Sequence, residues 1–204
     1  MSSQEIAAAV AYVFQNPDSQ IFAATVLDEV AFGPRNLGLT ADEVADRAAQ
    51  ALRAVGLADR DAHDPFTLSK GDRQRLAVAS VLALHPRLIV LDEPTTGLDY
   101  RQQLEMMAFL AELRAEGMAI VAITHSPWLA SDYAARGVLL RGGRIAYDGP
   151  LEELMGQEEL LTAAHFVAPE VVRLAHRLGF RAASLRAFEA HLRTTTARGA
   201  EHVD

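Results

Sequence analysis

Three short runs of consecutive apolar residues, at positions 10–14, 88–91 and 119–123, mark the first two-thirds of the chain. None of these runs alternates apolar and polar positions, which is typical of parallel strands covered on both faces. Segments with apolar residues at helical spacing lie between them. This alternation of strands and helices predicts an α/β fold with a parallel, doubly wound sheet.

Capping signals and apolar stripes define the helices between the strands. Thr40 and Glu43 match a capping box, and apolar residues follow them at helical spacing: Val44, Ala48, Leu52 and Val55. A second helix is predicted from Ser69 to a stop at Pro86. A third is predicted over residues 100–116, just before a glycine.

The last third of the chain has a different pattern. The stretch GVLLRGGRIAYDG predicts a β-hairpin that turns at Gly142 and Gly143. Further on, apolar residues stand at helical spacing in APEVVRLAHRLGF: Val171, Leu174, Ala175 and Leu178. We therefore predict an α/β domain over residues 1–150, a small helical C-terminal region over 151–193, and a flexible tail over 194–204.

Composition and charge exclude several classes of protein. The chain has 204 residues and a net charge of −8. Its arginines are scattered, which argues against a nucleic-acid partner because phosphate neutralisation needs clustered cations. The absence of cysteine excludes disulfides and thiolate metal sites. No apolar run approaches the roughly 18 residues that span a bilayer, and the N-terminus lacks the basic region of a secretory signal.

Polar residues follow each predicted strand. Gln15 ends the first, Asp92 and Glu93 end the second, and Thr124 and His125 follow the third. Ligands of open α/β sheets bind at the carboxyl ends of the strands. There Asp92 would hold Mg²⁺, Gln15 would add a neutral oxygen, Glu93 would polarise a water, and His125 would hydrogen-bond a terminal phosphate.

Simpler interpretations remain open for some of these residues. A lone glutamine after a strand is usually a turn residue, and a lone histidine there is usually satisfied locally. The stretch LIVLDEPTTGLD is far more specific, because it joins an apolar strand, two adjacent acids, a proline, a glycine and the second acid Asp99.

The stretch LSKGDRQR also has two compatible interpretations. Ser69 and Asp72 form an ordinary N-terminal helix cap. A helix that begins Ser-x-Gly also presents free backbone N–H groups to an anion. The same helix end can therefore cap itself and face a phosphate.

A phosphate loop of the form G-x-x-x-x-G-K-[ST] does not occur in these 204 residues. The single lysine is Lys70, within LSKGDRQR. A strand, phosphate loop, helix and returning strand take about 30 residues or more, and nine residues precede the first strand. We therefore expect a domain that begins after its phosphate loop.

Four stretches in order resemble the motifs of ABC-type ATPases: VFQNPDSQIF the Q-loop, LSKGDRQRLAVA the signature, LIVLDEPTTGLD the Walker B motif with the D-loop, and AITHS the H-loop. The resemblance covers about residues 10–150. It implies the P-loop NTPase fold of an ABC nucleotide-binding domain without its N-terminal portion. FQNPDSQIF, TVLDEVAFGPRNLGL and APEVVRLAHRLGF are similar, more narrowly, to the ATPase subunits of energy-coupling-factor importers of vitamins, cobalt or nickel.

The resemblance implies that ATP and Mg²⁺ bind between two ABC domains. In that arrangement Gln15 contacts Mg²⁺ and senses the membrane partner, and Asp92 holds Mg²⁺. Glu93 is the general base, and His125 contacts the γ-phosphate.

Other residues are expected to act on the nucleotide of the partner domain. Ser69, Gly71 and Asp72 belong to the signature, and Asp99 lies in the D-loop across the dimer. Two positions depart from the family pattern, because Lys70 stands where glycine is usual and Asp72 where glutamine is usual. An acid near a γ-phosphate is unfavourable, and we expect Lys70 to offset it.

These implications predict an ATP-binding subunit at the cytoplasmic face of the membrane, with a second ABC chain and a transmembrane subunit as partners and no nucleic acid. It would couple ATP hydrolysis to transport, but without a phosphate loop it would be inactive alone. Alternatives are a non-catalytic partner or a truncated product that only supplies its signature in trans, and a non-transport ABC ATPase of DNA repair or translation. Ile21 and Phe22 would lie near a groove for the membrane subunit, or else in the core.

Overall fold

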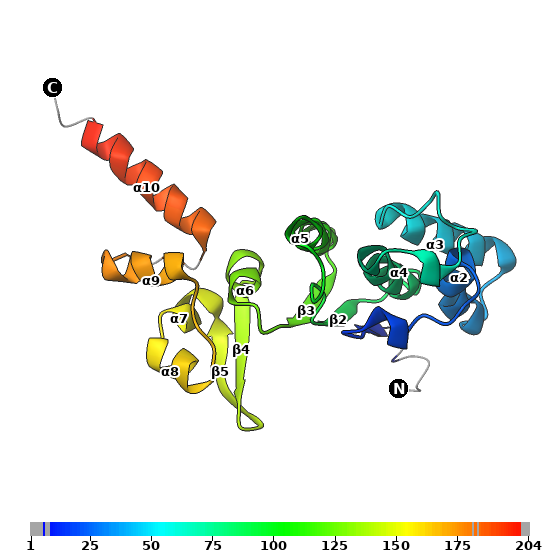
Figure 1. The fold of residues 1–204 in the computed structure, drawn as a ribbon, viewed down its shortest axis with the longest axis horizontal. Coiled ribbons are helices and arrows are strands. Elements are labelled where there is room, and N and C mark those ends of the chain that lie inside the picture. The colour runs from blue at the N-terminus through cyan, green and yellow to red at the C-terminus, as the bar shows by residue number, and fades with distance from the viewer. Residues whose placement is uncertain (1–5, 7–8, 181, 183, 201–204) are drawn as a thin grey trace. The chain divides into compact units, whose positions relative to one another are not determined.

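The chain folds into two compact units, Met1–Ile123 and Thr124–Asp204 (Figure 1). The structure is a computed structural model that describes residues 6, 9–180, 182 and 184–200. Among these residues no helix combines the length and the hydropathy that crossing a bilayer requires. The predicted domain boundary at residue 150 stays a prediction, because compact units are defined by contacts and domains by independent folding.

The first unit is built around a parallel sheet in the order β1-β2-β3. In β1 and β2, Tyr12 lies opposite Val90, and Val90 in turn lies opposite Val121 of β3. The predicted parallel sheet is therefore confirmed. The strands run over β1 Val10–Val13, β2 Leu88–Asp92 and β3 Ala119–Ile123.

One face of this sheet is buried and the other is open. Ala11 and Val13 of β1 and Ile89 and Leu91 of β2 are at most 4% exposed, and α4 (Lys70–Leu82) packs on that side against β1. Side chains of the opposite face, such as Val121, remain about half exposed. Within the described residues, helices thus cover one face of the sheet, whereas a doubly wound sheet has helices on both faces.

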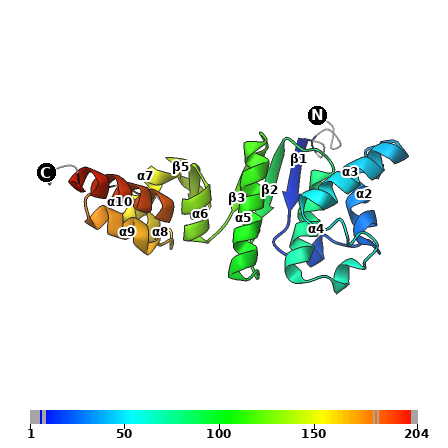
Figure 2. The same cartoon turned by 90° about the horizontal axis from the view of Figure 1, so that it is seen from above.

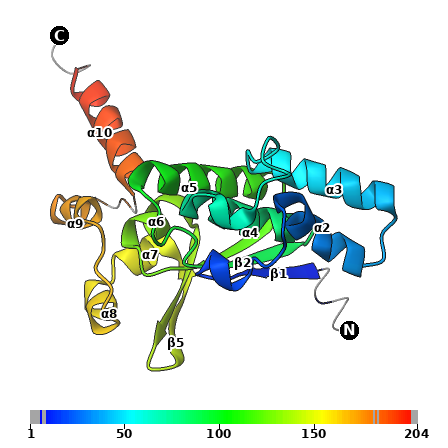
Figure 3. The same ribbon diagram turned by 45° about the vertical axis from the view of Figure 1, so that its right-hand side comes forward.

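Three helices pack side by side in the first unit (Figure 3): α2 Val26–Asn36, α3 Ala41–Ala54 and α4 Lys70–Leu82. The capping box of α3 is confirmed, since Thr40 Oγ1 accepts from the Glu43 backbone and the Glu43 carboxylate accepts from the Thr40 backbone. Its predicted apolar stripe is also buried. Two short 3₁₀ turns complete this part of the unit: η1 Pro17–Ser19 and η2 Pro65–Thr67.

The helices beside the sheet have the predicted starts and somewhat earlier ends. Ser69 is the N-cap of α4, which ends at Leu82 because the chain then turns through His85 at a φ of 55°. The helix α5 (Tyr100–Ala115) runs along β3, as α4 runs along β1 (Figure 2). It ends before Gly117, whose φ of 100° suits glycine.

The second unit begins with α6 (Pro127–Tyr133) and the predicted hairpin, β4 (Arg136–Arg141) and β5 (Arg144–Pro150). Gly142 and Gly143 form its turn with φ values of 56° and 73°, which confirms the prediction. Short helices pack on the hairpin and form a small core of Leu151, Leu154, Met155, Leu161, Ala168 and Val172. They are α7 Leu151–Met155, α8 Glu158–Ala163 and α9 Glu170–Arg177.

Of the apolar residues named at helical spacing in this segment, Ala175 is buried, whereas Leu174 and Leu178 are 46% and 59% exposed. Val172, at another position of α9, is also buried. The last helix, α10, spans Leu185–Ala200 and so extends into the segment expected to be a tail, and residues 201–204 lie outside the described residues.

Candidate functional site

The carboxyl end of β2 places two acids in a sharp turn. Asp92 is the last strand residue, and Glu93 follows with a φ of 46°, which is unusual for a residue with a side chain. The Glu93 backbone N–H still donates to the Ile123 carbonyl at 2.9 Å. The Thr96 backbone N–H donates to the Glu93 carbonyl at 3.1 Å and closes the turn. Such strained positions persist only where the surroundings fix them, and they cluster at functional sites.

Asp92 is held by a residue that sequence reasoning missed. The Tyr12 hydroxyl of β1 donates to Asp92 Oδ2 at 2.9 Å. This hydrogen bond raises the pKa of Tyr12, with smaller contributions from desolvation and from the Asp92 charge. Tyr12 interrupts an otherwise aliphatic strand on the open face, and this was the signal that could have identified it.

The donor set fits a magnesium ion. Mg²⁺ usually binds through one or two carboxylates and keeps several waters. Asp92 is partly exposed and Gln15 is exposed, two residues beyond the end of β1. No group of three or more histidine, cysteine or carboxylate side chains suited to a metal occurs among the residues described. Gln15 and Asp92 as metal ligands therefore stay predictions.

The loop after Gln15 is tied to the signature helix α4. The Gln20 side chain accepts from Phe14 N at 3.2 Å and donates to the Ala77 carbonyl at 3.3 Å. Asp18 forms an ion pair with Arg73 at 2.7 Å. These contacts were not predicted, because sequence alone did not indicate that the loop and α4 are adjacent.

A buried carboxylate shapes the segment that carries Phe22. Glu29 of α2 is 3% exposed, and its Oε2 accepts from the backbone N–H groups of Phe22 at 3.0 Å and Ala23 at 2.9 Å. Ile21 is buried at 4% exposure, so of the two predicted docking residues it belongs to the core. Phe22 is 60% exposed and stacks edge-on against Phe32.

The N-terminus of α4 is capped as predicted. Ser69 Oγ accepts from Asp72 N at 3.1 Å and donates to the Asp72 carboxylate at 2.9 Å. Ser69 and Lys70 are exposed, whereas Gly71 is buried. A Cβ at Gly71 would lie 2.8 Å from Gln102 Nε2 of α5, so one side of this glycine is covered by the chain itself.

Asp99 begins α5 with a capping box. Its Oδ1 accepts from Gln102 N at 2.8 Å, and Gln102 Oε1 accepts from Asp99 N at 3.1 Å. Asp99 is exposed, which suits the predicted position facing another subunit. His125 belongs to the second unit, two residues after β3 ends, and its role at the phosphate stays a prediction.

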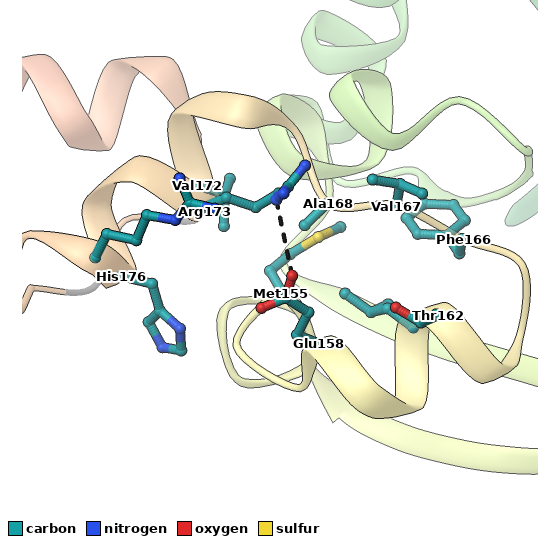
Figure 4. Close-up of a pocket in the computed structure, with 11 residues that line it drawn as sticks. Met155, Glu158, Thr162, Phe166, Val167, Ala168, Val172, Arg173 and His176 are labelled. Atoms are coloured by element: carbon teal, nitrogen blue, oxygen red, sulfur yellow. Dashed lines mark ion pairs between the residues drawn. The ribbon is translucent and has the colours of Figure 1, made fainter.

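The second unit contains a cavity of about 190 Å³ between α7, α8 and α9 (Figure 4). Met155, Leu161 and Val172 contribute apolar walls. Arg173 Nε lies 3.8 Å from Glu158 Oε1, and this ion pair bridges α9 and α8. No predicted site residue lines this cavity.

This chain is similar to known ABC transporter proteins. The family profile described as ABC transporter matches residues 1–96. An ABC transporter ATP-binding protein of Pyrococcus furiosus is 43% identical over 180 residues, which are 88% of this chain and 68% of that protein. A similarly named protein of Caldanaerobacter subterraneus is 49% identical over 175 residues, which are 86% of this chain and 31% of that one. The energy-coupling factor transporter ATP-binding protein of Methanocaldococcus jannaschii is 42% identical over 83% of this chain and 61% of its own length.

Two solved structures with a similar fold are also ABC proteins. The cbiO1 protein of Clostridium perfringens, described as part of the ABC transporter complex cbiONQ, superposes with a TM-score of 0.70 and 33% identity, over 78% of this chain and 63% of that one. An ATP-binding cassette in a dimeric, post-hydrolysis state with ADP and Pi gives a TM-score of 0.63 at 26% identity, over 74% of this chain and 68% of that one. The fold is that of the ABC-type P-loop NTPases.

The chain therefore belongs to the family of ABC transporter ATP-binding proteins. Proteins of this family generally bind ATP with Mg²⁺. The match spans 68% of the Pyrococcus relative and 31% of the Caldanaerobacter relative.

Proposed function

We propose that this chain is an ATP-binding subunit of an energy-coupling-factor importer and couples ATP hydrolysis to uptake of a vitamin or of cobalt or nickel ions. One observation carries the proposal: Asp92 and Glu93 stand in a strained turn at the carboxyl edge of the parallel sheet. Relatives named as energy-coupling factor ATP-binding proteins, and the likeness to cbiO1, support the importer class.

In this function ATP supplies the transferred phosphoryl group, and Mg²⁺ neutralises charge on its phosphates. Asp92 would hold the ion with Gln15, and the Tyr12 hydroxyl fixes the orientation of the Asp92 carboxylate. Glu93 would accept a proton from the attacking water. His125 hydrogen-bonds the terminal phosphate.

The N-terminus of α4 acts on the nucleotide of a partner subunit. Ser69 offers a hydroxyl, and the first N–H groups of the helix favour a negative charge. Asp72 takes part by holding the Ser69 side chain at 2.9 Å. Asp99 is exposed and reaches the same partner. The partners are a second ABC chain and a transmembrane subunit, so the protein works at the cytoplasmic face of the membrane.

A first test concerns the chain by itself. These 204 residues contain no phosphate loop, which normally provides most contacts to the β- and γ-phosphates. Titration of the purified chain with labelled ATP and Mg²⁺ should therefore show neither tight binding nor turnover. Micromolar affinity, with turnover abolished by Glu93→Gln, would contradict this expectation.

A second test asks whether the N-terminus of α4 acts in trans on the nucleotide of a partner. Mixing the chain with an ABC ATPase that has its own phosphate loop should raise the partner's turnover, and Ser69→Arg should cancel the rise. Ser184→Arg is the matched control. Ser184 also caps a helix, since its Oγ accepts from Ala187 N at 3.2 Å, but it lies in the second unit.

The alternative role for Ser69 is capping alone. Ser69→Asp keeps a good cap but adds a negative charge where a phosphate would bind. If this variant and Ser69→Arg both stimulate the partner as well as the parent chain does, the function in trans is excluded.

A further inference from the structure

We propose that Lys70 and Gln102 are positioning residues that lock the N-terminus of α4 to the loop carrying Glu93 and Asp99. The two parts would then move as one body. The proposal rests on two reciprocal contacts, in which a side chain of each segment lies on a glycine of the other. It extends the proposed function by linking the site within this subunit to the surface that acts on the partner.

The first contact joins Lys70 to Gly97. A Cβ at Gly97 would lie 3.2 Å from Lys70 Cδ and 2.8 Å from Cε, with Nζ closer still. The lysine stem therefore occupies the space over this glycine, whose φ of 77° also disfavours other residues. A cation at a helix N-terminus opposes the helix dipole, so the dipole does not explain why Lys70 stands there. Its contact with Gly97 does.

The second contact runs in the opposite direction, from α5 to α4. The Gln102 amide lies on Gly71, where a Cβ would be 2.8 Å from Nε2 and 3.0 Å from Cδ. The same amide accepts from Asp99 N at 3.1 Å and thereby closes the cap of α5. A shift of α4 at Gly71 would therefore disturb the group that fixes Asp99.

Further contacts connect α4 with the loop after β2 and with α5. Gly97 follows Thr96, whose backbone N–H bonds the Glu93 carbonyl at 3.1 Å. Farther along the helices, Arg75 of α4 forms an ion pair with Glu105 of α5. The contact of Lys70 with Gly97 thus reaches Glu93, and the contact of Gln102 with Gly71 reaches Asp99.

Hydrogen exchange measured by NMR on the chain itself tests the lock. Lys70→Ala should speed exchange of the hydrogen-bonded amides within residues 93–98, which are those of Glu93, Thr96 and Leu98. We expect an increase of about threefold to tenfold, as for losing a contact worth one neutral hydrogen bond. Gln102→Ala should speed exchange at Asp99 and also at the capped amide of Asp72, on the other segment. Lys70→Met keeps an unbranched stem over Gly97 and should restore exchange at residues 93–98 to the parent rate.

Glu112→Ala is the control, because Glu112 is an exposed residue farther along α5, away from Gly71 and Gly97. It should leave residues 70–72 and 93–98 unchanged. A double-mutant cycle of Lys70→Ala and Gln102→Ala should be non-additive, since both act on one lock. Additive effects, each confined to the mutated segment, would overturn the proposal.

The exchange test needs neither nucleotide nor partner. Failure of the proposed function would appear instead as lost stimulation in the mixing experiment with normal exchange. The two proposals can therefore fail separately.

Discussion

Removal of the buried Glu29 carboxylate should loosen the segment that presents Phe22. Both backbone N–H groups bonded by Glu29 point at the same oxygen, Oε2, at 3.0 Å from Phe22 and 2.9 Å from Ala23. Glu29→Ala leaves both groups without this acceptor. Glu29→Gln can place an amide oxygen at the same point and keep both bonds without the charge.

The expected loss in free energy of unfolding follows from these two hydrogen bonds. Hydrogen bonds to a charged group contribute about 1.5–3 kcal/mol each, so two give about 3–6 kcal/mol. Phe22 is 60% exposed, so water can satisfy part of what is lost, and we expect the lower end for Glu29→Ala. Neutral hydrogen bonds contribute about 0.5–1.5 kcal/mol each, so Glu29→Gln should lose about half as much.

The assay uses the position of the only tryptophan. Trp128 lies in the second unit, so its fluorescence follows the unfolding of that unit, whereas far-UV circular dichroism follows both. Urea unfolding of Glu29→Ala should shift the dichroism transition to lower urea, and comparison with the fluorescence transition shows whether the second unit unfolds together with the first. Glu112→Ala, at an exposed position of α5, is the matched control and should change neither.

The relative stability of Glu29→Gln and Glu29→Ala tests whether a shared acceptor oxygen holds this segment. If Glu29→Gln is as destabilising as Glu29→Ala, the charge rather than the shared acceptor stabilises the segment. If neither variant shifts the dichroism transition by more than the Glu112 control does, Glu29 does not hold this segment and the assigned hydrogen bonds carry no measurable stability.

Three further predictions concern other contacts. Phe22→Ala should weaken co-purification with the membrane subunit at little cost in stability, whereas lost stability with unchanged association would place Phe22 in the core. Asp92→Asn should lower the pKa of Tyr12 toward its usual value near 10, and an unchanged NMR titration would contradict their hydrogen bond. The Arg136 guanidinium lowers the pKa of Asp148, so hairpin protection against hydrogen exchange should be full above about pH 4 and fall as the pH drops through the lowered pKa. Asp148→Asn should remove that dependence, and its persistence would contradict the ion pair as the cause.

The strands, the helix starts and the hairpin were predictable because each depends on local signals. A capping box such as that of Thr40 needs only residues three apart, and the turn at Gly142 and Gly143 needs only two glycines. The ends of helices were less predictable. The helix α4 ends at Leu82 rather than at Pro86, because the backbone turns at His85 before the proline is reached.

The exposure of Leu174 and Leu178 did not follow from the sequence, for a tertiary reason. Apolar spacing shows that a face can be buried, but whether it is buried depends on the elements available to cover it. Leu174 and Leu178 match the spacing and are nevertheless exposed within the described second unit. Tyr12, Gln20 and Glu29 were missed similarly, since their partners lie in other segments or in the backbone.

The signature shows most clearly what local reasoning did not reveal. That Lys70 offsets the charge of Asp72 near a γ-phosphate stays a prediction. In the structure Asp72 accepts from the Ser69 hydroxyl, and Lys70 lies over Gly97 in another segment. A residue that departs from the family pattern is therefore best explained by its contact across the fold, because Gly97 provides space that no neighbour in the sequence reveals. The same holds for Gly71, where the missing side chain makes room for Gln102 and thereby for the cap of Asp99.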